Sequence, residues 1–324
     1  MRAVVHTRYG PPEVLRVEEV KKPAPGHDEV LVRVHAATVN RTDCGFRSAK
    51  YVVSRLFTGL VRPKRTIGGS EFAGKVVAVG ADVSEFAAGD DVFGFEDVRA
   101  GAHAEYKTNA ADGSIARMPD GFSYGQMAPA AEGATYALCS IHSAGVQAGD
   151  KVLVYGASGA IGSAAVQILK HLDAEVTAVC GTQNVELARS LGADRVIDYQ
   201  TEDFTQIGDR FEFIFDAVGK SSYRACKSLL SQNGMYGSTE LGRGGQNPLL
   251  AIWFALTRTR RVIFPVPKIT QETTECIGQL IACGAYRPVI DRSYPLEEIV
   301  EATRYVETGQ KTGNVVITVF SDAK

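Results

Sequence analysis

The chain lacks the segments that mark membrane-spanning, secreted and nucleic-acid-binding proteins. Its longest apolar run, residues 248–256, is far shorter than the roughly 20 residues that cross a bilayer. No charged-then-apolar signal segment opens the sequence, so we expect a cytoplasmic protein. A formal net charge of -2 over 324 residues leaves no basic excess for binding nucleic acid.

Cysteine is also scarce. The six cysteines show no C-x-x-C spacing, so we expect neither a disulfide framework nor a structural zinc site, and a reducing compartment is the default. The remaining composition, with 45% hydrophobic and 22% charged residues, is typical of a globular protein. At roughly 100 to 200 residues per domain, the length predicts two domains.

The stretch at residues 151–162, KVLVYGASGAIG, predicts a strand, a tight turn and the start of a helix. Its glycines are spaced G-x-x-G-x-x-G, at Gly156, Gly159 and Gly162. Glycine permits a positive φ and a close approach of backbone. The unpaired N–H groups at the helix start favour an anion, and the pyrophosphate of a dinucleotide is the usual occupant. A sharp turn that binds no ligand can carry the same pattern, so the strands and helices around the turn must decide between the two interpretations.

Strands and helices alternate after this turn. Apolar periodicity predicts strands at 175–179, 195–199, 211–216 and 234–237, and helices at 185–191 and 223–230. This alternation indicates an α/β domain with a doubly wound parallel sheet, whose ligands bind beyond the carboxyl ends of the strands. Together with the glycine turn, three later segments should therefore line one crevice, at 180–184, 217–219 and 237–240.

The first 120 residues lack this alternation. They contain short Val-rich strands separated by Pro and Gly, at 2–5, 15–20, 30–39, 74–79, 91–95 and 104–106. After residue 264 come two helices and a last strand, at 270–283, 296–308 and 314–319. That strand has no partner in a completed nucleotide-binding sheet, so we expect the tail to return to the first domain. We assign 1–122 with 265–324 to a mostly-β domain, and 123–264 to the nucleotide-binding domain.

Five stretches occur in an order that is typical of one family: MRAVVHTRYGPPEVL, GGSEFAGKVVAVG, GASGAIG, SLGADRVIDY and GQKTGNVVI. Along its whole length, the chain resembles the zinc-free, quinone-oxidoreductase-like branch of the medium-chain dehydrogenase/reductase superfamily. The resemblance implies a GroES-like catalytic domain, a Rossmann-type cofactor domain and a cleft between them. It also implies hydride transfer with a nicotinamide cofactor, and a homodimer.

The resemblance also bears on metal binding. Alcohol dehydrogenases of this superfamily hold a catalytic zinc with Cys, His and a further Cys or acid. Here Asn40 stands at the first place, Ser70 at the second, and Glu132 offers the only ligand atom near the third. Carboxylates without thiolate or imidazole make a poor zinc site, and the four-cysteine lobe of the structural zinc is missing. We therefore predict no metal. We interpret the nearby Cys44 as a small thiol, buried or partly exposed, and not as a ligand or nucleophile.

The segment after the second strand of the nucleotide-binding domain (175–179) bears on the choice of cofactor. A carboxylate there would select NAD, but residues 179–184 contain no acid, and no Lys or Arg either, so NADPH is favoured over NAD(H). By resemblance, the expected cofactor contacts are Gly156, Ser158, Gly159, Ala160, Ile161 and Gly162 in the turn, Thr182, Asn184 and Tyr199 at the 2′-phosphate, Thr135 at the carboxamide, Tyr236, Gly237 and Ser238 in the loop over the cofactor, and Val218 and Asn314. The pattern gives no account of Glu132.

The reacting centre is expected at residues 40–51, which match the family's N-x-x-D-x-x-x-R-x-x-x-Y. By resemblance, Asn40 bonds the substrate oxygen or the nicotinamide ribose, and Tyr51 stacks on a flat substrate and donates a proton. Asp43 and Arg47 are four residues apart and can pair on one helical turn. A folding clamp is the alternative for these two.

These features predict a zinc-independent, NADPH-dependent oxidoreductase that acts on quinones or α,β-unsaturated carbonyl compounds. Conjugation spreads the negative charge that hydride addition creates, so hydrogen bonds could replace a Lewis acid. A trans-2-enoyl thioester reductase is the nearest alternative. An NADPH-binding structural or regulatory protein with little turnover is the alternative from another class.

Two further segments mix apolar and basic residues. We expect residues 52–66 to form a lid or mouth for the substrate. For residues 248–261 we expect a buried helix that leads into an edge strand, of the kind that pairs subunits in this superfamily. Contact of the same segment with a membrane surface is the alternative.

Overall fold

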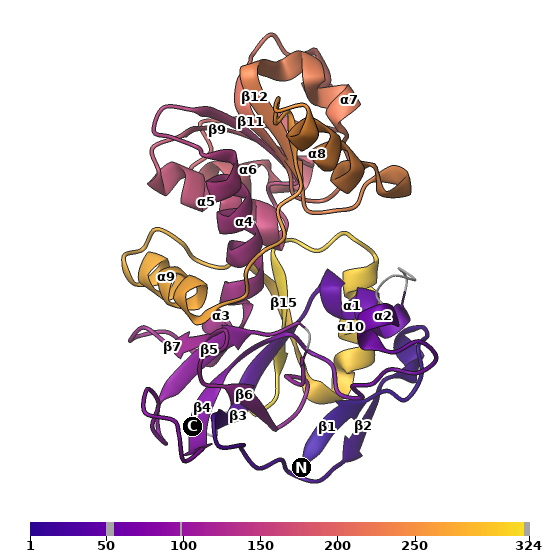
Figure 1. Ribbon diagram of the computed structural model, residues 1–324, viewed down its shortest axis with the longest axis vertical. Helices are drawn as coiled ribbons and strands as arrows, with labels where there is room; N and C mark the ends of the chain where they lie inside the picture. Colours follow the sequence, from indigo (N-terminus) through magenta and orange to yellow (C-terminus); the bar gives the residue numbers. More distant parts are fainter. Residues whose placement is uncertain (50–54, 98, 321–324) are drawn as a thin grey trace. The chain divides into compact units, whose positions relative to one another are not determined.

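The computed structural model describes residues 1–49, 55–97 and 99–320, in two units (Figure 1). Unit 1 contains Met1–Glu132, Ile269–Cys283 and Pro288–Lys324, and unit 2 contains Gly133–Lys268 and Gly284–Arg287. The first boundary falls after residue 132, later than the predicted 122, because α3 (Tyr124–Met127) packs on the strands of unit 1. The second falls after residue 268 rather than 264.

Unit 1 is built around a seven-stranded sheet. Six of its strands follow the order β14 (Ile290–Pro295), β15 (Asn314–Thr318), β3 (Glu29–Val39), β4 (Glu71–Val79), β5 (Asp91–Phe95) and β7 (Ile115–Arg117). The seventh, β6 (Tyr106–Ala110), also pairs with β3. A separate antiparallel pair joins β1 (Arg2–Val5) to β2 (Arg16–Glu19). The expected mostly-β domain is confirmed.

The tail returns to unit 1, as predicted. β15 runs antiparallel to β3, with Val316 opposite Thr38. The sequence did not predict β14, which pairs parallel with β15. Its residues are mostly exposed or half-buried and include Asp291 and Arg292, so it lacks the apolar alternation by which strands are recognised.

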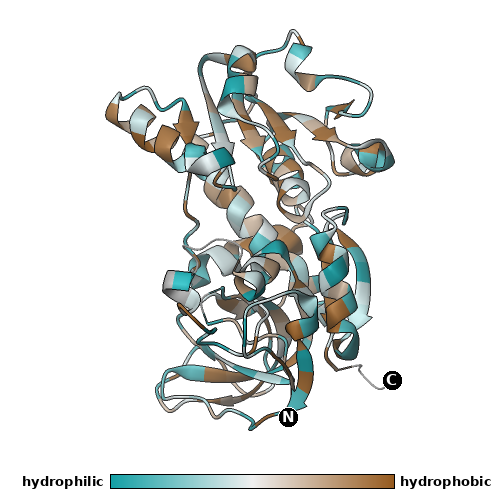
Figure 2. Cartoon of the chain, turned by 90° about the vertical axis from the view of Figure 1, so that its right-hand side faces the viewer, coloured by the Kyte–Doolittle hydropathy of each residue, from teal (hydrophilic) through white to brown (hydrophobic). Residues whose placement is uncertain are grey.

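The core of unit 1 lies between its sheet and α10 (Ile299–Glu307). Ile299, Ala302 and Val306 recur at helical spacing on the buried face of α10 and belong to the same cluster as Phe72 and Ile317. Figure 2 shows hydrophobic segments recurring along the strands that carry such buried side chains.

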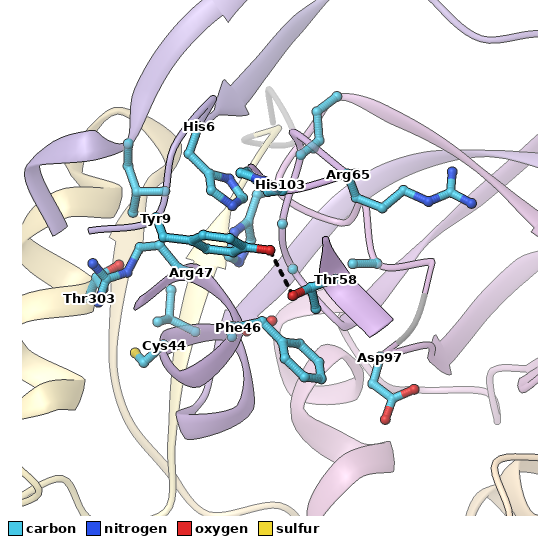
Figure 3. A pocket seen from close by; sticks show the side chains of 18 of the residues that line it. His6, Tyr9, Cys44, Phe46, Arg47, Thr58, Arg65, Asp97, His103 and Thr303 are labelled. Carbon is cyan, nitrogen blue, oxygen red and sulfur yellow. Dashed lines mark hydrogen bonds between the residues drawn. The ribbon is translucent and has the colours of Figure 1, made fainter. Parts of the chain in front are cut away.

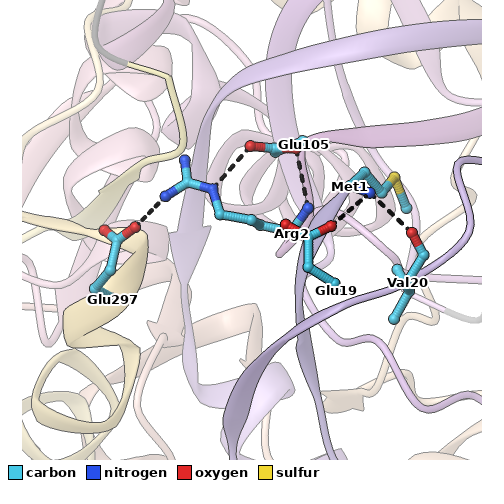
Figure 4. Close-up of polar contacts among 6 residues, drawn as sticks. All are labelled: Met1, Arg2, Glu19, Val20, Glu105 and Glu297. Carbon is cyan, nitrogen blue, oxygen red and sulfur yellow. Dashed lines mark hydrogen bonds and ion pairs between the residues drawn. The ribbon is translucent and has the colours of Figure 1, made fainter.

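Arg2 joins three parts of unit 1 (Figure 4). Its backbone N–H and its Nε each donate to the carboxylate of Glu105 at 2.9 Å. Its guanidinium also pairs with Glu297, in the short helix η8 (Leu296–Glu298) before α10. These contacts fasten the first strand to two segments that are distant in sequence.

Unit 2 is a six-stranded sheet in which every pairing of the described strands is parallel. Its order is β10 (Arg195–Asp198), β9 (Glu175–Cys180), β8 (Lys151–Tyr155), β11 (Phe211–Asp216), β12 (Leu230–Ser238) and β13 (Val262–Ile263). Numbered along the chain, this is the order 3-2-1-4-5-6 of a doubly wound dinucleotide-binding sheet. The predicted Rossmann-type domain is confirmed.

Helices cover both faces of this sheet (Figure 1). α5 (Ala160–His171) and α6 (Val185–Ser190) lie on one face, and α7 (Tyr223–Cys226) and α8 (Gln246–Leu256) on the other. Since the strands are parallel, the segments after β8, β9, β11 and β12 meet at one edge. This is the edge at which the sequence predicted a crevice.

The expectation that residues 248–261 form a buried helix is wrong in one respect. α8 contacts β13 and the edge of the sheet, but its other face carries a stripe of exposed apolar residues, Leu249, Ile252, Trp253 and Leu256. The expected edge strand is present as β13. Across the described residues, α8 and every other helix are too short or too polar to span a membrane.

Candidate functional site

The glycine turn of unit 2 connects β8 to α5 and has the geometry that its spacing predicted. Gly156 has a φ of +83°. A Cβ added at Gly162 would lie 2.1 Å from the carbonyl oxygen of Gly156, so only glycine allows the helix to start this close to the turn. Gly159 is the N-cap, and the N–H groups of Ala160, Ile161 and Gly162 occupy the first turn of α5. The first N–H groups of a helix have no partner within it, so this turn can bind an anion.

Ser158 lies in this turn, and two other segments border it. Val218, in the loop after β11, packs so closely on Gly156 that an added Cβ there would lie 2.6 Å from Cγ1 of the valine. The first turn of α4 (Ala131–Ala144) lies close to the start of α5, because a Cβ added at Gly133 would lie 2.8 Å from the carbonyl oxygen of Ala160. Thr135, two residues further along α4, is buried. Val218 is thus brought to the glycine turn, as expected.

Asp216 organises the loop after β11, although sequence reasoning gave it no role. Its Oδ1 accepts hydrogen bonds from the backbone N–H groups of Val218 and Gly219, at 3.2 and 2.8 Å. Its Oδ2 accepts from the N–H of Ser221 at 2.8 Å and from the hydroxyl of Tyr236 at 3.0 Å. The side chain of Tyr236 is fully buried, so it holds this loop instead of facing the cofactor crevice.

The other residues predicted to cover the cofactor belong to β12. Gly237 lies within the strand and packs against Phe213. Ser238 ends the strand, and its Oγ accepts a hydrogen bond from the N–H of Glu240 at 3.2 Å. Ser238, at the end of β12, therefore reaches the predicted edge of the sheet, whereas Gly237 packs against another strand of the sheet.

The three predicted 2′-phosphate residues lie beyond β9 and β10. Thr182 is exposed, and its hydroxyl lies 2.6 Å from both Asp198 Oδ2 and Gln200 Oε1. Tyr199 is 50% exposed, and its ring lies over Gly181. Asn184 precedes α6. Asp198 brings a carboxylate to this region from the neighbouring strand, although the segment after β9 itself carries no acid.

Asn314, the last predicted cofactor residue, belongs to β15 of unit 1. Its Nδ2 donates to the carbonyl oxygen of Val289 at 3.0 Å, and its backbone N–H donates to the same oxygen at 2.8 Å. Its side chain is buried, so this amide fixes the start of the strand. A role in cofactor binding stays a prediction.

In the predicted reacting centre, α1 (Arg41–Ser48) begins at Asn40. The Oδ1 of Asn40 accepts from the N–H of Asp43 at 2.8 Å, and Asp43 Oδ2 accepts from the N–H of Asn40 at 3.2 Å. This reciprocal capping box fixes the first turn of the helix. The Nδ2 of Asn40 donates to Ser70 Oγ at 2.7 Å. Tyr51 lies outside the described residues.

Arg47 does not have the partner that its spacing suggested. Its guanidinium donates to the carbonyl oxygen of Gly10 and pairs with the carboxylate of Glu307, at the end of α10. Arg47 is buried, and this pair joins α1 to α10. Asp43 instead caps the N-terminus of α1. Burial raises the pKa of its carboxyl to about 7. Both residues therefore hold the segment in place, which supports the clamp interpretation.

Two buried glutamates next to α1 were not recognised as a pair from the sequence. Glu71 Oε1 accepts from the N–H of Glu132 at 2.7 Å, and Oε2 accepts from the hydroxyl of Thr38 at 2.8 Å. Glu132 Oε1 accepts from the hydroxyl of Thr42 at 2.6 Å. Burial raises the pKa of Glu71 to about 7, and burial together with Glu71 raises the pKa of Glu132 well above its ordinary value.

A lysine lies within electrostatic reach of both glutamates. Lys311 is half-buried, and its partial desolvation lowers its pKa, while Glu132 and Glu71 act in the opposite direction. One ammonium cannot balance two carboxylates, so the pair retains a proton near neutral pH. This accounts for Glu132, which the sequence left unexplained. An acid at the start of the largely apolar strand β4 was the available signal for Glu71.

Comparisons with known proteins agree with this geometry. Residues 26–142 match the alcohol dehydrogenase GroES-like domain, and residues 191–317 match the zinc-binding dehydrogenase family. The chain is 31% identical to a 2-methylene-furan-3-one reductase of Solanum lycopersicum, over 98% of this chain and 79% of that protein. It is 29% identical to an NADPH-dependent alkenal/one oxidoreductase of Arabidopsis thaliana, with the same two coverages of 98% and 79%.

Among solved structures, the quinone oxidoreductase of Coxiella burnetii superposes with a TM-score of 0.88 at 27% sequence identity, covering 99% of each chain. Unit 2 is thus the NAD(P)-binding domain of a dehydrogenase, and unit 1 is its GroES-like partner. With the five motifs and the strand order of unit 2, these matches show that the chain is an oxidoreductase and belongs to the quinone-oxidoreductase-like branch of the medium-chain dehydrogenase/reductase superfamily.

Proposed function

We propose that this protein reduces quinones or α,β-unsaturated carbonyl compounds with NADPH and without zinc. The observation that carries the proposal is the hydrogen bond of 2.7 Å from Asn40 Nδ2 to Ser70 Oγ. Zinc-dependent relatives need ligands at these two positions, but here a neutral amide and a hydroxyl are bonded to each other. An amide N–H group has no lone pair to offer a metal.

The residues near the third ligand position do not fit zinc either. Glu132 accepts a hydrogen bond from Thr42 and has a raised pKa, whereas a zinc ligand must be deprotonated. Within 1–49, 55–97 and 99–320, no three His, Cys, Asp or Glu side chains are grouped so as to hold a metal ion. The proposed reaction therefore takes no step through zinc.

The glycine turn fits a dinucleotide, because Gly156 and Gly162 leave its backbone N–H groups open to a pyrophosphate. When bound, NADPH supplies the hydride. The chain holds the pyrophosphate at the first turn of α5, and Asp216 fixes the loop beside it. A conjugated acceptor delocalises the charge that it receives, which suits a protein without a metal ligand set.

NADPH is proposed over NADH on two grounds. The Arabidopsis relative is named as NADPH-dependent, and no acid follows β9 within residues 181–184. Tyr199 is exposed near this position and can donate to a phosphate. Asp198 opposes the preference, because its carboxylate beside Thr182 would repel a 2′-phosphate.

The test is NADPH oxidation, followed by the loss of its near-ultraviolet absorbance, with quinones, short enones and enoyl thioesters as acceptors. We expect turnover with the first two classes, and lower turnover in Tyr51→Phe. Turnover restricted to thioesters would support an enoyl thioester reductase. NADPH binding without turnover on any acceptor would favour a regulatory protein, and one equivalent of tightly bound zinc would contradict the zinc-free proposal.

We also propose a homodimer that pairs through the edge of unit 2. Among the described strands β13 ends the sheet, and the apolar stripe of α8 lies beside it. Light scattering coupled to size-exclusion chromatography should give twice the chain mass, and Trp253→Glu should shift it to the monomer. A monomeric wild type that floats with anionic liposomes would favour the membrane alternative instead.

A further inference from the structure

Unit 1 contains a cavity of about 200 Å³ beside α1. Figure 3 shows it between the segment after β1, the helix α1 and the end of α2 (Arg55–Thr58). Its walls are largely apolar, with Leu15, Val39, Phe46 and Ile67 among the lining residues. An apolar cavity of roughly 150 Å³ can hold benzene, so this one has room for a ligand of one or two rings.

Two buried polar atoms at this cavity have no hydrogen-bond partner within the described part of the chain. They are Nδ1 of His6 and Nε of Arg47. His6 is 7% exposed and Arg47 is 4% exposed. An unpaired polar group costs free energy when it is buried. A ligand oxygen placed between the two residues would satisfy the Nε–H donor of Arg47 and could also bond the imidazole.

The interior of the cavity favours a neutral ligand over an anion. The positive charge of Arg47 is already paired with the carboxylate of Glu307. Burial lowers the pKa of His6, so this imidazole is neutral at neutral pH. Lys64 and Arg65 are exposed, and Figure 3 shows the Arg65 and Asp97 side chains directed away from His6 and Tyr9. No unpaired cation of the described lining therefore faces the interior.

The cavity is also suited to an electrophile. Cys44 is part of its wall, and quinones and enones alkylate thiolates. Burial, with the nearby Asp43 and Glu307, raises the pKa of the Cys44 thiol to about 12. The reactive thiolate is thus almost absent at neutral pH. An electrophilic ligand can lie against this cysteine without forming a bond.

We propose that this cavity holds the ring of the acceptor, an uncharged one- or two-ring quinone or cyclic enone, with an acceptor oxygen bonded between His6 and Arg47. The inference rests on the proposed function for the class of ligand. The inference adds that this cavity of unit 1 selects among acceptors by the size of their rings. It also gives a purpose to part of residues 52–66, which we expect to form a lid or mouth, because Thr58, Pro63, Lys64 and Arg65 contribute to the wall. Residues 52–54 of that segment lie outside the described residues.

Two variants change the cavity in opposite directions. His6→Phe removes the imidazole and fills the space, and we expect the KM for 1,4-naphthoquinone to rise by about tenfold or more, with the KM for NADPH unchanged. Phe46→Ala enlarges the space, and we expect kcat/KM for the three-ring 9,10-phenanthrenequinone to rise relative to naphthoquinone. His27→Phe is the matched control, because His27 is exposed and lies outside the cavity.

A binding experiment separates this proposal from the proposed function. Calorimetric titration of the cofactor-free protein with 1-tetralone, a two-ring ketone without an electrophilic alkene, should show binding that His6→Phe weakens and His27→Phe does not. Binding of this kind without turnover of any acceptor would contradict the proposed function but keep the cavity as a ligand site. Unchanged tetralone binding and unchanged acceptor selectivity in both cavity variants would overturn the inference, even with full turnover.

Discussion

The hydroxyl of Tyr236 donates a hydrogen bond to Asp216, with 3.0 Å between Oη and Oδ2, inside the parallel sheet of unit 2. Asp216 ends β11 and Tyr236 lies in the adjacent strand β12, and the same carboxylate holds three backbone N–H groups of the loop after β11. A buried pair of this kind shapes the loop that borders the glycine turn. Tyr236 therefore stabilises this loop through Asp216.

Tyr236→Phe tests this role. The variant loses one hydrogen bond to a buried carboxylate, so we expect the free energy of unfolding to fall by about 1 to 2 kcal/mol. The Kd for NADPH, followed by its fluorescence, should stay near the wild-type value because the ring does not face the crevice. A large rise in Kd with unchanged stability would instead return Tyr236 to direct cofactor contact.

Gly162→Ala tests the closeness of α5 to the turn. Because the added Cβ would lie 2.1 Å from the carbonyl oxygen of Gly156, we expect a loss of about 2 kcal/mol or more in stability, with weaker NADPH binding. Gly159→Ala is the matched control, since its nearest neighbour would lie at an ordinary 3.5 Å. Thermal unfolding of both variants checks the difference. Equal melting temperatures would show that the backbone relaxes around the methyl group.

Asp198→Asn addresses cofactor preference. The carboxylate lies 2.6 Å from the hydroxyl of Thr182, where it would repel a 2′-phosphate. Its removal should raise the ratio of kcat/KM for NADPH to that for NADH by roughly tenfold, which corresponds to about 1.4 kcal/mol. Glu175→Gln, at the opposite end of β9, should leave the ratio unchanged. A ratio that stays constant in both variants would place the phosphate elsewhere.

Arg47 and Glu307 allow a double-mutant cycle. Removal of either partner should destabilise unit 1 by about 2 kcal/mol, because each change leaves the other charge partly buried and unpaired. The double variant Arg47→Met with Glu307→Gln should cost less than the sum of the two single changes. Denaturant unfolding gives the coupling free energy. Additive effects would show that the pair contributes no interaction of its own.

Glu71 should make stability depend on pH. Burial raises its pKa from the ordinary 4.5 to about 7, so the folded state binds its proton more tightly than the unfolded state. The free energy of unfolding therefore falls as the pH rises from about 4.5 to about 7. Glu71→Gln should flatten this slope by up to about 1.4 kcal/mol per pH unit, whereas Glu18→Gln, on an exposed strand, should not. A slope shared by Glu71→Gln and the wild type would contradict the assignment.

Local patterns were sufficient for much of the fold. β1 and β11 have the bounds that their apolar residues predicted, and the glycine spacing located the turn before α5. β7 and β14 were missed because the first has three residues and the second is polar, so neither shows a clear period. The boundary after residue 132 was also missed, since helical periodicity does not reveal on which sheet α3 packs.

The candidate site was less predictable because its partners are distant in sequence. Arg47 pairs with Glu307, 260 residues further along the chain, although Asp43 stood at a suitable helical spacing. A motif also does not distinguish a strand residue whose side chain faces the core, such as Tyr236, from one that faces a ligand. The pairing of Glu71 with Glu132 depends on the approach of α4 to β4, which no local pattern encodes.

The pairing of β15 with β3 has a consequence for synthesis of the chain on the ribosome. β3 is made early, but its neighbour β15 emerges only after every strand of the six-stranded sheet has been made. Unit 2 can therefore complete its sheet while β3 still lacks one partner. During this time the edge of β3 in unit 1 stays unpaired. A chaperone that shields β-strand edges would then protect the nascent chain from aggregation.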